Sequence, residues 1–257
     1  MRSSLLSAIE PVIHGFFGCQ GGISQGDFAT LNGGMWVGDD PAAVAENRKR
    51  MLRALSASQF ELCTLHQVHS ARVKLVAADA SVPADCVEAD ALVTCDAGLM
   101  LGIATADCAP VLFAATGSGI IAAAHAGWRG ALAGVLPNTL AAMCRLGVSD
   151  PAAVHAAIGP MIQQPSFEVG GEVRAAFIAK QADWEIFFTP SLRTGFFLFD
   201  LSALLQAQLE ALHVTVDRIA VDSYQAHNDY FSHRYASRQR QAASGRQLAL
   251  IGHRSQI

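Results

Sequence analysis

The chain has 257 residues, of which 51% are hydrophobic and only 16% are charged, and its formal net charge is −4. This composition predicts a protein with a large buried core and excludes a disordered chain, because the average globular domain has about 25% charged residues. Basic residues are dispersed along the sequence, so we expect no nucleic-acid partner. We expect one domain over residues 1–257, since single α/β domains reach roughly 200–250 residues.

The first half of the chain alternates short apolar runs with helical patterns. Asp40-Pro41 predicts an N-cap and the first position of a helix, after which Val44, Met51, Leu52 and Leu55 recur at helical spacing. The runs that predict strands are Glu61–Leu65, Arg72–Val76, Ala91–Cys95, Leu99–Thr105, Pro110–Ala115 and Gly119–Ala124. A helical pattern follows over Trp128–Leu146, and we expect Pro137 to kink or divide it.

The second half repeats this style. Strands are predicted at Val154–Ile158, Phe196–Phe199, Val216–Val221 and Gln247–Ile251, and helices at Gly170–Lys180 and Leu201–Leu212, the latter capped by Asp200. Strands outnumber helices, and some neighbouring strands are close enough to form hairpins. We therefore predict an α/β fold of the α+β type, in which mixed sheets are flanked by helices.

No segment predicts export or a membrane span. The apolar start of the chain is interrupted by Glu10 and Pro11 before a signal-peptide core forms. The apolar stretch 97–115 contains Asp107 and Pro110, and two buried strands joined at Asp107-Cys108 explain it better than a spanning helix. We expect a cytoplasmic protein without a membrane partner, either a monomer or a homodimer.

Six cysteines lie at irregular spacings without a Cys-x-x-Cys pair: Cys19, Cys63, Cys86, Cys95, Cys108 and Cys144. A disulfide framework is therefore not expected, and most of these thiols should be small buried apolar groups. Cys108 is the exception, because it is flanked by polar residues where an apolar strand ends.

Three segments place ligand-type side chains at strand ends, and the candidates are His69, Cys108 and His125. The segments are Leu65-His66-Gln67-Val68-His69, Ala104-Thr105-Ala106-Asp107-Cys108, and Ala124-His125-Ala126-Gly127-Trp128-Arg129-Gly130. Imidazole and thiolate ligands suit zinc, and a catalytic zinc site uses three protein ligands and keeps one open position. Each of these side chains taken alone is more often a core residue than a ligand. His66 would face away from His69 on a strand, so we interpret it as a supporting or structural residue.

These segments resemble the signatures of the YfiH-like family, whose members are also called laccase-domain or polyphenol-oxidase-like proteins and are now described as purine nucleoside phosphorylases. The resemblance spans nearly the whole chain, and the His-Ala-Gly-Trp-Arg-Gly element at 125–130 is its most specific part. Further matching motifs are His14-Gly15-Phe16-Phe17, Gly21-Gly22-Ile23-Ser24, Leu31-Asn32, Val37-Gly38-Asp39-Asp40, Ala45-Glu46-Asn47-Arg48, Gly159-Pro160, Phe167-Glu168-Val169-Gly170, Phe231-Ser232-His233-Arg234 and Ser244-Gly245-Arg246.

The resemblance implies that His69, Cys108 and His125 bind zinc. It also implies phosphorolysis of adenosine, inosine, guanosine and methylthioadenosine, together with adenosine deamination, on a fold of mixed sheets flanked by helices. Three features depart from the family pattern. Gly18-Cys19 stand where the family usually has Thr-Arg, Ser166 replaces a cysteine, and the segment between Arg234 and Ser244 is longer.

The implied reactions need groups for proton transfer and for anion binding. Asp107, beside Cys108, is the candidate for proton transfer, and the alternative is that it orients a ligand histidine. Phosphate requires cations, and Arg129, Arg48 and Arg246 are the candidates, helped by the N-terminus of the helix predicted after Gly127. Trp128 either stacks on a purine or packs in the core.

Three other interpretations remain. A copper-dependent polyphenol oxidase would use the same ligands, since copper(II) binds such sites strongly, but nine histidines without a His-x-His pair are few for a multicopper centre. A metal-free hydrolase could use Cys108 as nucleophile and His125 as base, on an amide such as a peptidoglycan precursor. A non-enzymatic scaffold would not require three ligand-type side chains at one site.

Overall fold

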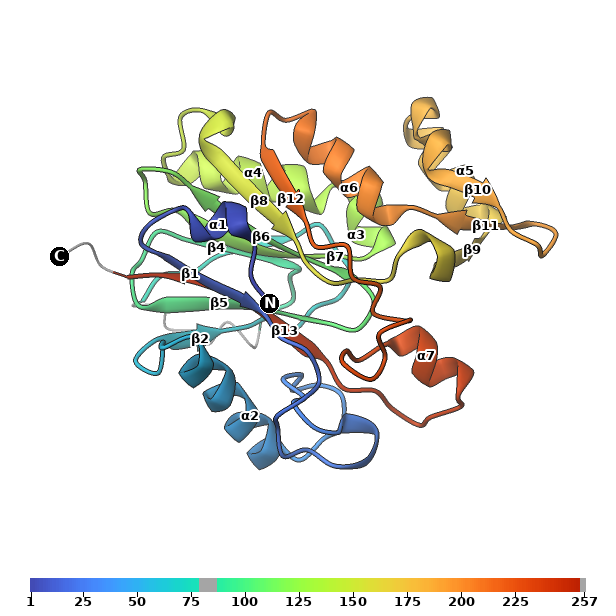
Figure 1. Cartoon of the computed structure of the whole chain (residues 1–257). Helices are drawn as coiled ribbons and strands as arrows, with labels where there is room; N and C mark the ends of the chain where they lie inside the picture. The colour runs from blue at the N-terminus through green and yellow to red at the C-terminus, as the bar shows by residue number, and fades with distance from the viewer. Residues whose placement is uncertain (79–86, 255–257) are drawn as a thin grey trace.

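The computed structural model describes residues 1–78 and 87–254 of the chain, so Cys86 lies outside the described residues. Within them the strands form one six-stranded, one four-stranded and one three-stranded sheet (Figure 1). The helices are α1 (Ser4–Ser7), α2 (Pro41–Ala54), α3 (Trp128–Ala133), α4 (Val135–Leu146), α5 (Gly171–Lys180), α6 (Leu201–Glu210) and α7 (His233–Arg238).

The six-stranded sheet has the order β12-β8-β6-β7-β4-β3, and the four-stranded sheet has the order β1-β13-β5-β2. The strands of the larger sheet are β3 (Val73–Leu75), β4 (Ala91–Thr94), β6 (Ala109–Ala115), β7 (Ile121–Ala126), β8 (Val154–Ile158) and β12 (Thr215–Arg218). Those of the four-stranded sheet are β1 (Val12–Phe16), β2 (Glu61–Cys63), β5 (Leu99–Thr105) and β13 (Gln247–His253). A small sheet of β9 (Glu168–Gly170), β10 (Phe188–Pro190) and β11 (Phe196–Phe199) lies beside α5.

Both larger sheets mix parallel and antiparallel pairs, as the sequence predicts. β6 and β7 form an antiparallel hairpin, whereas β3 pairs with β4 and β12 pairs with β8 in parallel. In the four-stranded sheet β13 is antiparallel to both of its neighbours, and β2 is parallel to β5. The expected mixed α/β fold is therefore confirmed.

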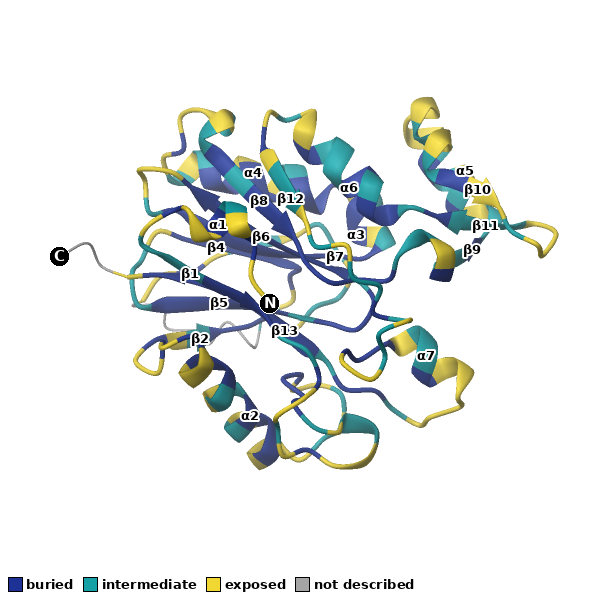
Figure 2. Cartoon of the chain, viewed as in Figure 1, coloured by how far each residue is buried: buried dark blue, intermediate teal, exposed yellow. Residues whose placement is uncertain are grey.

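The molecule is layered, with helices outside and two sheets packed face to face between them (Figure 1). Helices α3, α4 and α6 cover the outer face of the six-stranded sheet, and α2 covers the outer face of the four-stranded sheet. Strand alternation builds these layers. Val111 and Phe113 of β6 join the helix-side core, while Leu112 between them joins the core between the sheets. Figure 2 shows the buried residues concentrated in the central strands.

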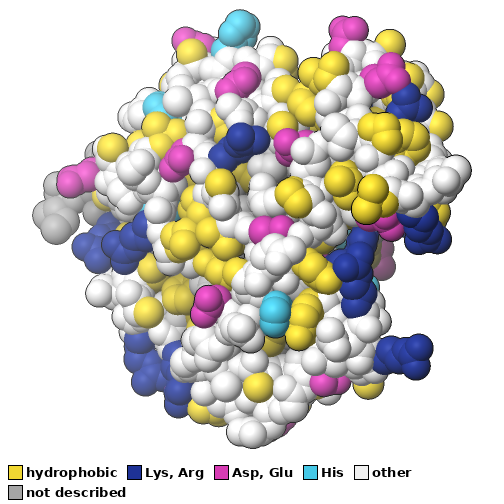
Figure 3. All heavy atoms as spheres, turned by 45° about the vertical axis from the view of Figure 1, so that its right-hand side comes forward, with side chains coloured by type: hydrophobic (Ala, Val, Ile, Leu, Met, Phe, Trp, Pro, Cys, Tyr) yellow, Lys and Arg dark blue, Asp and Glu magenta, His cyan; other side chains and the backbone are white. Residues whose placement is uncertain are grey.

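The strands β5 and β6 confirm that the apolar stretch 97–115 is two buried strands joined at Asp107-Cys108. They belong to different sheets, so the chain passes from one sheet to the other at this turn. Among the described residues no helix combines the length and the apolar character that a bilayer span requires. On the face in Figure 3 the Lys and Arg side chains lie in separate groups among acidic and apolar ones.

The expected helix over 128–146 is divided at Gly134, not at Pro137. Gly134 has a φ of 93°, a left-handed conformation that glycine adopts without steric cost. Pro137 lies in the first turn of α4, where a missing N–H breaks no helical hydrogen bond. The prediction of a break at Pro137 is wrong because it considered proline alone.

Candidate metal centre and its pocket

The three predicted ligands lie together although they come from distant parts of the chain. His69 follows β2, Cys108 lies in the turn between β5 and β6, and His125 belongs to β7. Their donor atoms all lie within 4.8 Å of one another, and Cys108 Sγ is 3.9 Å from His69 Nε2. In the described ranges this is the one group of three or more His, Cys, Asp or Glu side chains close enough to share an ion.

The donor set fits a zinc-type ion. Two ligand atoms of a tetrahedral zinc lie about 3.3–3.8 Å apart, given Zn–N and Zn–S bonds of about 2.0 and 2.3 Å. The three donors therefore need to move inward by less than about 1 Å. Two imidazoles and a thiolate leave one position of a tetrahedron open, which is the arrangement of a catalytic site.

Gly127 explains how these side chains approach one another so closely. A Cβ atom at this position would lie 2.9 Å from Cys108 Sγ and 3.1 Å from His69 Cδ2. Any side chain here would press on two of the three ligands, so the glycine after His125-Ala126 is a requirement of the site.

A buried carboxylate, Asp90, orients the site, and the sequence analysis did not identify it. Its Oδ1 accepts hydrogen bonds from His125 Nδ1 at 2.8 Å and from the His69 backbone N–H at 2.9 Å. Its Oδ2 accepts from the Ser70 hydroxyl at 2.7 Å and from the Ser70 N–H. Because Nδ1 of His125 donates to Asp90, its Nε2 lone pair is left for a metal, the usual support of a ligand histidine.

The ionisation of the site follows from these contacts. Burial opposes the charged form of Asp90, but hydrogen bonds from His125 and Ser70 outweigh it and lower the pKa to about 2. Burial also raises the pKa of the Cys108 thiol, yet the charge of His125 and hydrogen bonds from both histidines lower it to about 6. Burial lowers the pKa of His125, whereas the Cys108 thiolate and Asp90 raise it to about 9. Without a metal, these shifts favour a thiolate–imidazolium pair of Cys108 and His125.

The turn at Asp107 is held from both sides. Asp107 has a φ of 87°, an uncommon conformation for a residue with a side chain. Its Oδ1 accepts from the Ser223 hydroxyl at 2.8 Å and its Oδ2 accepts from the Arg234 backbone N–H at 2.6 Å. These bonds tie the β5–β6 turn, and hence Cys108, to the start of α7. The carboxylate that hydrogen-bonds to a ligand histidine is Asp90, and a role of Asp107 in proton transfer stays a prediction.

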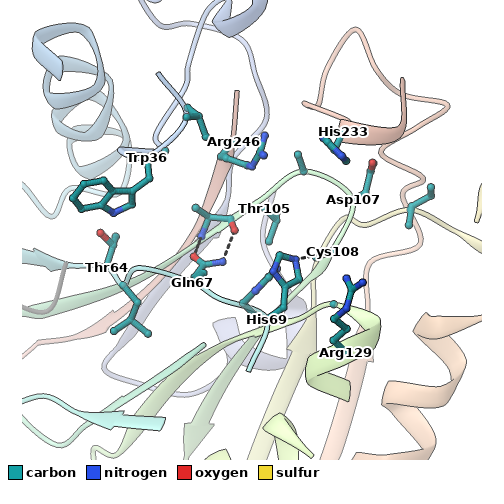
Figure 4. Close-up of a pocket in the computed structure, with 18 of the residues that line it drawn as sticks. Trp36, Thr64, Gln67, His69, Thr105, Asp107, Cys108, Arg129, His233 and Arg246 are labelled. Atoms are coloured by element: carbon teal, nitrogen blue, oxygen red, sulfur yellow. Dashed lines mark hydrogen bonds between the residues drawn. The ribbon is translucent and has the colours of Figure 1, made fainter. Parts of the chain in front are cut away.

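The candidate metal centre opens into a cavity of about 570 Å³. All the residues singled out from the sequence line it, namely Arg48, His69, Asp107, Cys108, His125, Trp128, Arg129 and Arg246. Figure 4 shows Gln67, His69 and Thr105 in its middle, with Asp107, Arg129 and His233 on one side and Trp36 and Thr64 on the other.

The three candidate cations differ in their surroundings. Arg129 is exposed, with its guanidinium 4.4 Å from the centre of the Trp128 ring. Arg246 Nη1 donates to the carbonyls of Ser244 and Gly245. Arg48 donates from Nε to the Gly33 carbonyl and from Nη2 to the Thr64 hydroxyl. The helix after Gly127 is only six residues long, so its dipole contributes less than the continuous helix that the sequence predicted.

Three further pocket residues were not identified as candidates. Trp36 is exposed at the rim, and Gln67 is fixed by a pair of 2.8 Å hydrogen bonds to the Ala104 backbone. The buried Thr105 hydroxyl has no hydrogen-bond partner among the described residues. The His66 ring lies against Trp36, with ring centres 5.4 Å apart. The one sequence signal for Gln67 and Thr105 is that each lies among the polar residues at the end of an apolar strand.

The fold and the site together define a layered, mixed α/β protein with a His₂Cys group that could hold a metal ion where the chain crosses between its two main sheets. The chain belongs to the family described as multi-copper polyphenol oxidoreductase laccase, whose model matches residues 13–254.

Relatives within this family carry another name. The chain is 43% identical to a purine nucleoside phosphorylase of Pseudomonas aeruginosa over 196 residues, 76% of each chain. It is 37% identical to a purine nucleoside phosphorylase of Deinococcus radiodurans over 242 residues, 94% of this chain and 89% of that one. Among solved structures, the YfiH protein of Bacillus licheniformis superposes with a TM-score of 0.87 at 25% identity, covering 97% of this chain and 96% of its own. The predicted resemblance to the YfiH-like family is confirmed.

Proposed function

We propose that this protein is a zinc-dependent purine nucleoside phosphorylase that also deaminates adenosine. The observation that carries the proposal is a group of three potential metal ligands in the middle of a cavity of about 570 Å³ that four arginines also line. The names of its relatives support the reaction class. The proposed nucleosides are adenosine, inosine, guanosine and methylthioadenosine. We expect a cytoplasmic monomer or homodimer.

His69, Cys108 and His125 would hold the metal, and the low pKa of Cys108 supports binding because the thiolate is the ligand form. When bound, zinc supplies a Lewis acid to the cavity. Asp90 keeps His125 in the tautomer that binds a metal. Imidazole and thiolate ligands suit zinc or copper, whereas carboxylate ligands suit magnesium, calcium or manganese.

Phosphorolysis requires a phosphate held beside the glycosidic bond, and the arginines of the cavity meet this need. Arg129 is open to the cavity and has no ion-pair partner among the described residues. Arg246 Nη1 donates to two backbone carbonyls, which fixes the position of this guanidinium. Arg48 is fixed by donating to the Gly33 carbonyl and the Thr64 hydroxyl. Guanidinium groups match phosphate oxygens in pairs. We assign phosphate binding to Arg129 with Arg246, and support of the loop behind them to Arg48.

Deamination requires proton transfer at the purine, for which Asp107 is the proposed group because it lines the cavity next to Cys108. Replacing Asp107 with asparagine tests the role. If it transfers protons, deamination of adenosine should fall far more than phosphorolysis of inosine. An equal fall in both, with weaker metal binding, would instead assign Asp107 to holding the turn.

Product analysis with inosine and adenosine, each with and without phosphate, tests the proposed function. Ribose 1-phosphate should form only when phosphate is present, and adenosine should also give inosine without phosphate. Formation of free ribose, or no cleavage by metal-loaded protein, would reject the phosphorylase assignment.

A second candidate is a metal-free Cys-His hydrolase acting on an amide such as a peptidoglycan precursor. Its support is that Cys108 and His125 lie close together, with the pKa of the thiol lowered and that of the imidazole raised, which favours a thiolate–imidazolium pair. A chelator separates the two: it should abolish turnover by the metal enzyme and leave a cysteine hydrolase active, whereas a thiol alkylator alone would inactivate the hydrolase.

A copper-dependent polyphenol oxidase is the third candidate, and the description of the family favours it. A multicopper centre needs several clusters of ligands, and the described residues provide one. A single copper in this site remains an alternative to zinc. Metal analysis of protein produced in zinc-replete, copper-free medium, combined with assays of nucleoside cleavage and phenol oxidation, distinguishes them.

A further inference from the structure

Trp36 is an exposed tryptophan at the rim of the cavity. Its side chain is 64% exposed, more than expected for the largest apolar side chain of a protein. It belongs to the loop that follows β1 and precedes α2, and both it and the neighbouring Met35 line the cavity. Among the described residues, Trp36 belongs to none of the four hydrophobic clusters.

The backbone that carries Trp36 is fixed. The buried Asn32 side chain accepts hydrogen bonds from the backbone N–H groups of Gly34 and Arg246, both at 2.9 Å, and donates to Asp39 at 2.8 Å. At Gly33 a Cβ atom would lie 2.5 Å from the Leu248 side chain, so the loop lies directly against β13. The ring is therefore presented to solvent from a rigid support.

A second ring stands beside the first. The imidazole of His66 lies 5.4 Å from the Trp36 ring, centre to centre, at an interplanar angle of 39°. The His66 backbone is held on both sides, since its N–H donates to Val87 and its carbonyl accepts from Ala89. His66 precedes the ligand His69 by three residues and also lines the cavity. His66 therefore belongs to the same segment that provides the candidate ligand His69, and Trp36 packs against it from another loop.

Trp36 and Arg129, one of the two arginines assigned to phosphate, lie on different sides of the ligand His69. Figure 4 places Trp36 on one side of the cavity and Arg129, Asp107 and His233 on the other, with His69 between them. A nucleoside has an aromatic base at one end and a sugar at the other. A base on the Trp36 side would place the sugar near the ligands and leave the Arg129 side for phosphate.

We propose that Trp36 is the stacking surface for the purine base, supported by His66, and thereby contributes to the binding of the nucleoside. The inference rests on the proposed function. Aromatic side chains attract bases of any sequence because every base has a π face, and alanine substitution of such a ring costs about 1–3 kcal/mol per base, or roughly 5- to 150-fold in affinity. Trp36 thus acts on substrate binding and takes no part in bond cleavage.

The test compares W36A and W36F in zinc-loaded full-length protein, with L192A as control. Leu192 is a fully exposed apolar residue outside the cavity, in the connection between β10 and β11. For W36A we expect the KM for inosine to rise about tenfold, with kcat and the KM for phosphate close to wild type. W36F keeps an aromatic ring and should stay near wild type, as should L192A. Calorimetric titration with inosine should show the same order of affinities.

Three results would overturn the inference while wild type remains an active phosphorylase. The KM for inosine could be unchanged in W36A. The KM for inosine could rise equally in W36A and W36F, which would show that binding does not depend on an aromatic ring at this position. W36A could alter self-association in sedimentation while leaving the KM unchanged, which would make Trp36 a contact between copies. If wild type binds inosine in a Trp36-dependent way but forms no ribose 1-phosphate, the base subsite stands and the proposed reaction fails. If wild type neither binds inosine nor cleaves it, both the base subsite and the proposed reaction are rejected.

Discussion

Replacing Asp90 with asparagine should weaken the metal site without removing any ligand. Asp90 is fully buried and accepts hydrogen bonds from His125 Nδ1, the His69 N–H and both donors of Ser70. Asparagine has one acceptor oxygen and one NH₂ donor. Both oxygens of Asp90 accept hydrogen bonds, so the NH₂ group of an asparagine would face N–H or O–H donors in either orientation of its amide. The hydrogen bonds on that side would be lost, and donors would face each other.

The magnitude follows from the pKa of Asp90. Lowering from 3.8 to about 2 corresponds to about 2 kcal/mol of folding stability. Because the folded-state pKa is depressed, this stability is present above about pH 4 and is lost as the pH falls towards 2. Unsatisfied buried donors cost about 1–3 kcal/mol more. Loss of a carboxylate behind a ligand histidine typically reduces metal affinity about 10- to 100-fold.

Competition with a chromophoric chelator measures zinc affinity, and urea unfolding of the metal-free protein measures stability. The matched control is S70A, which removes one hydroxyl donor but keeps the carboxylate and its bond to His125. We expect S70A to cost about 1 kcal/mol and to bind zinc nearly as wild type does. Wild-type zinc affinity in D90N would refute the orienting role of Asp90.

Four further outcomes are expected. G127A should lose zinc binding while still folding, as metal analysis and circular dichroism would show, because a Cβ would press on Cys108 and His69; bound zinc in G127A would contradict this. R129A should raise the KM for phosphate about tenfold and leave that for inosine unchanged. Iodoacetamide should alkylate Cys108 in metal-free protein with a midpoint near pH 6, and zinc should protect it. Burial lowers the pKa of His14 to about 4. About 3 kcal/mol of folding stability, present above pH 6.5, should therefore be lost as the pH falls towards 4. H14Q should not show this loss.

Much of the fold could be predicted from apolar periodicity. Strands β5, β8 and β11 have the predicted bounds, because each is an uninterrupted apolar or aromatic run between turn residues. The edge strand β1 was missed, since His14 and Gly15 interrupt its short apolar pattern. Assignment of β5 and β6 to different sheets also could not be predicted, because strand pairing depends on contacts distant in sequence.

The candidate site could be predicted in part. Ligand-type residues at strand ends, together with the family resemblance, led to His69, Cys108 and His125, and the structure brings them together. Asp90 was missed because no motif surrounds it in the sequence. It directly precedes β4, and its role comes from hydrogen bonds to residues distant in sequence. Trp36 carries no local signal either, since exposure cannot be read from the residues around it. The single-domain organisation and the roles of the pocket residues stay predictions.

Titration of metal-free protein with zinc, with inosine phosphorolysis followed at each step, tests the central claim most directly. We predict that turnover rises in proportion to bound zinc and saturates at about one ion per chain, the stoichiometry of a single three-ligand site. C108A, measured in parallel, should neither bind the ion tightly nor produce ribose 1-phosphate. Full turnover in metal-free wild type, or in C108A, would contradict the account.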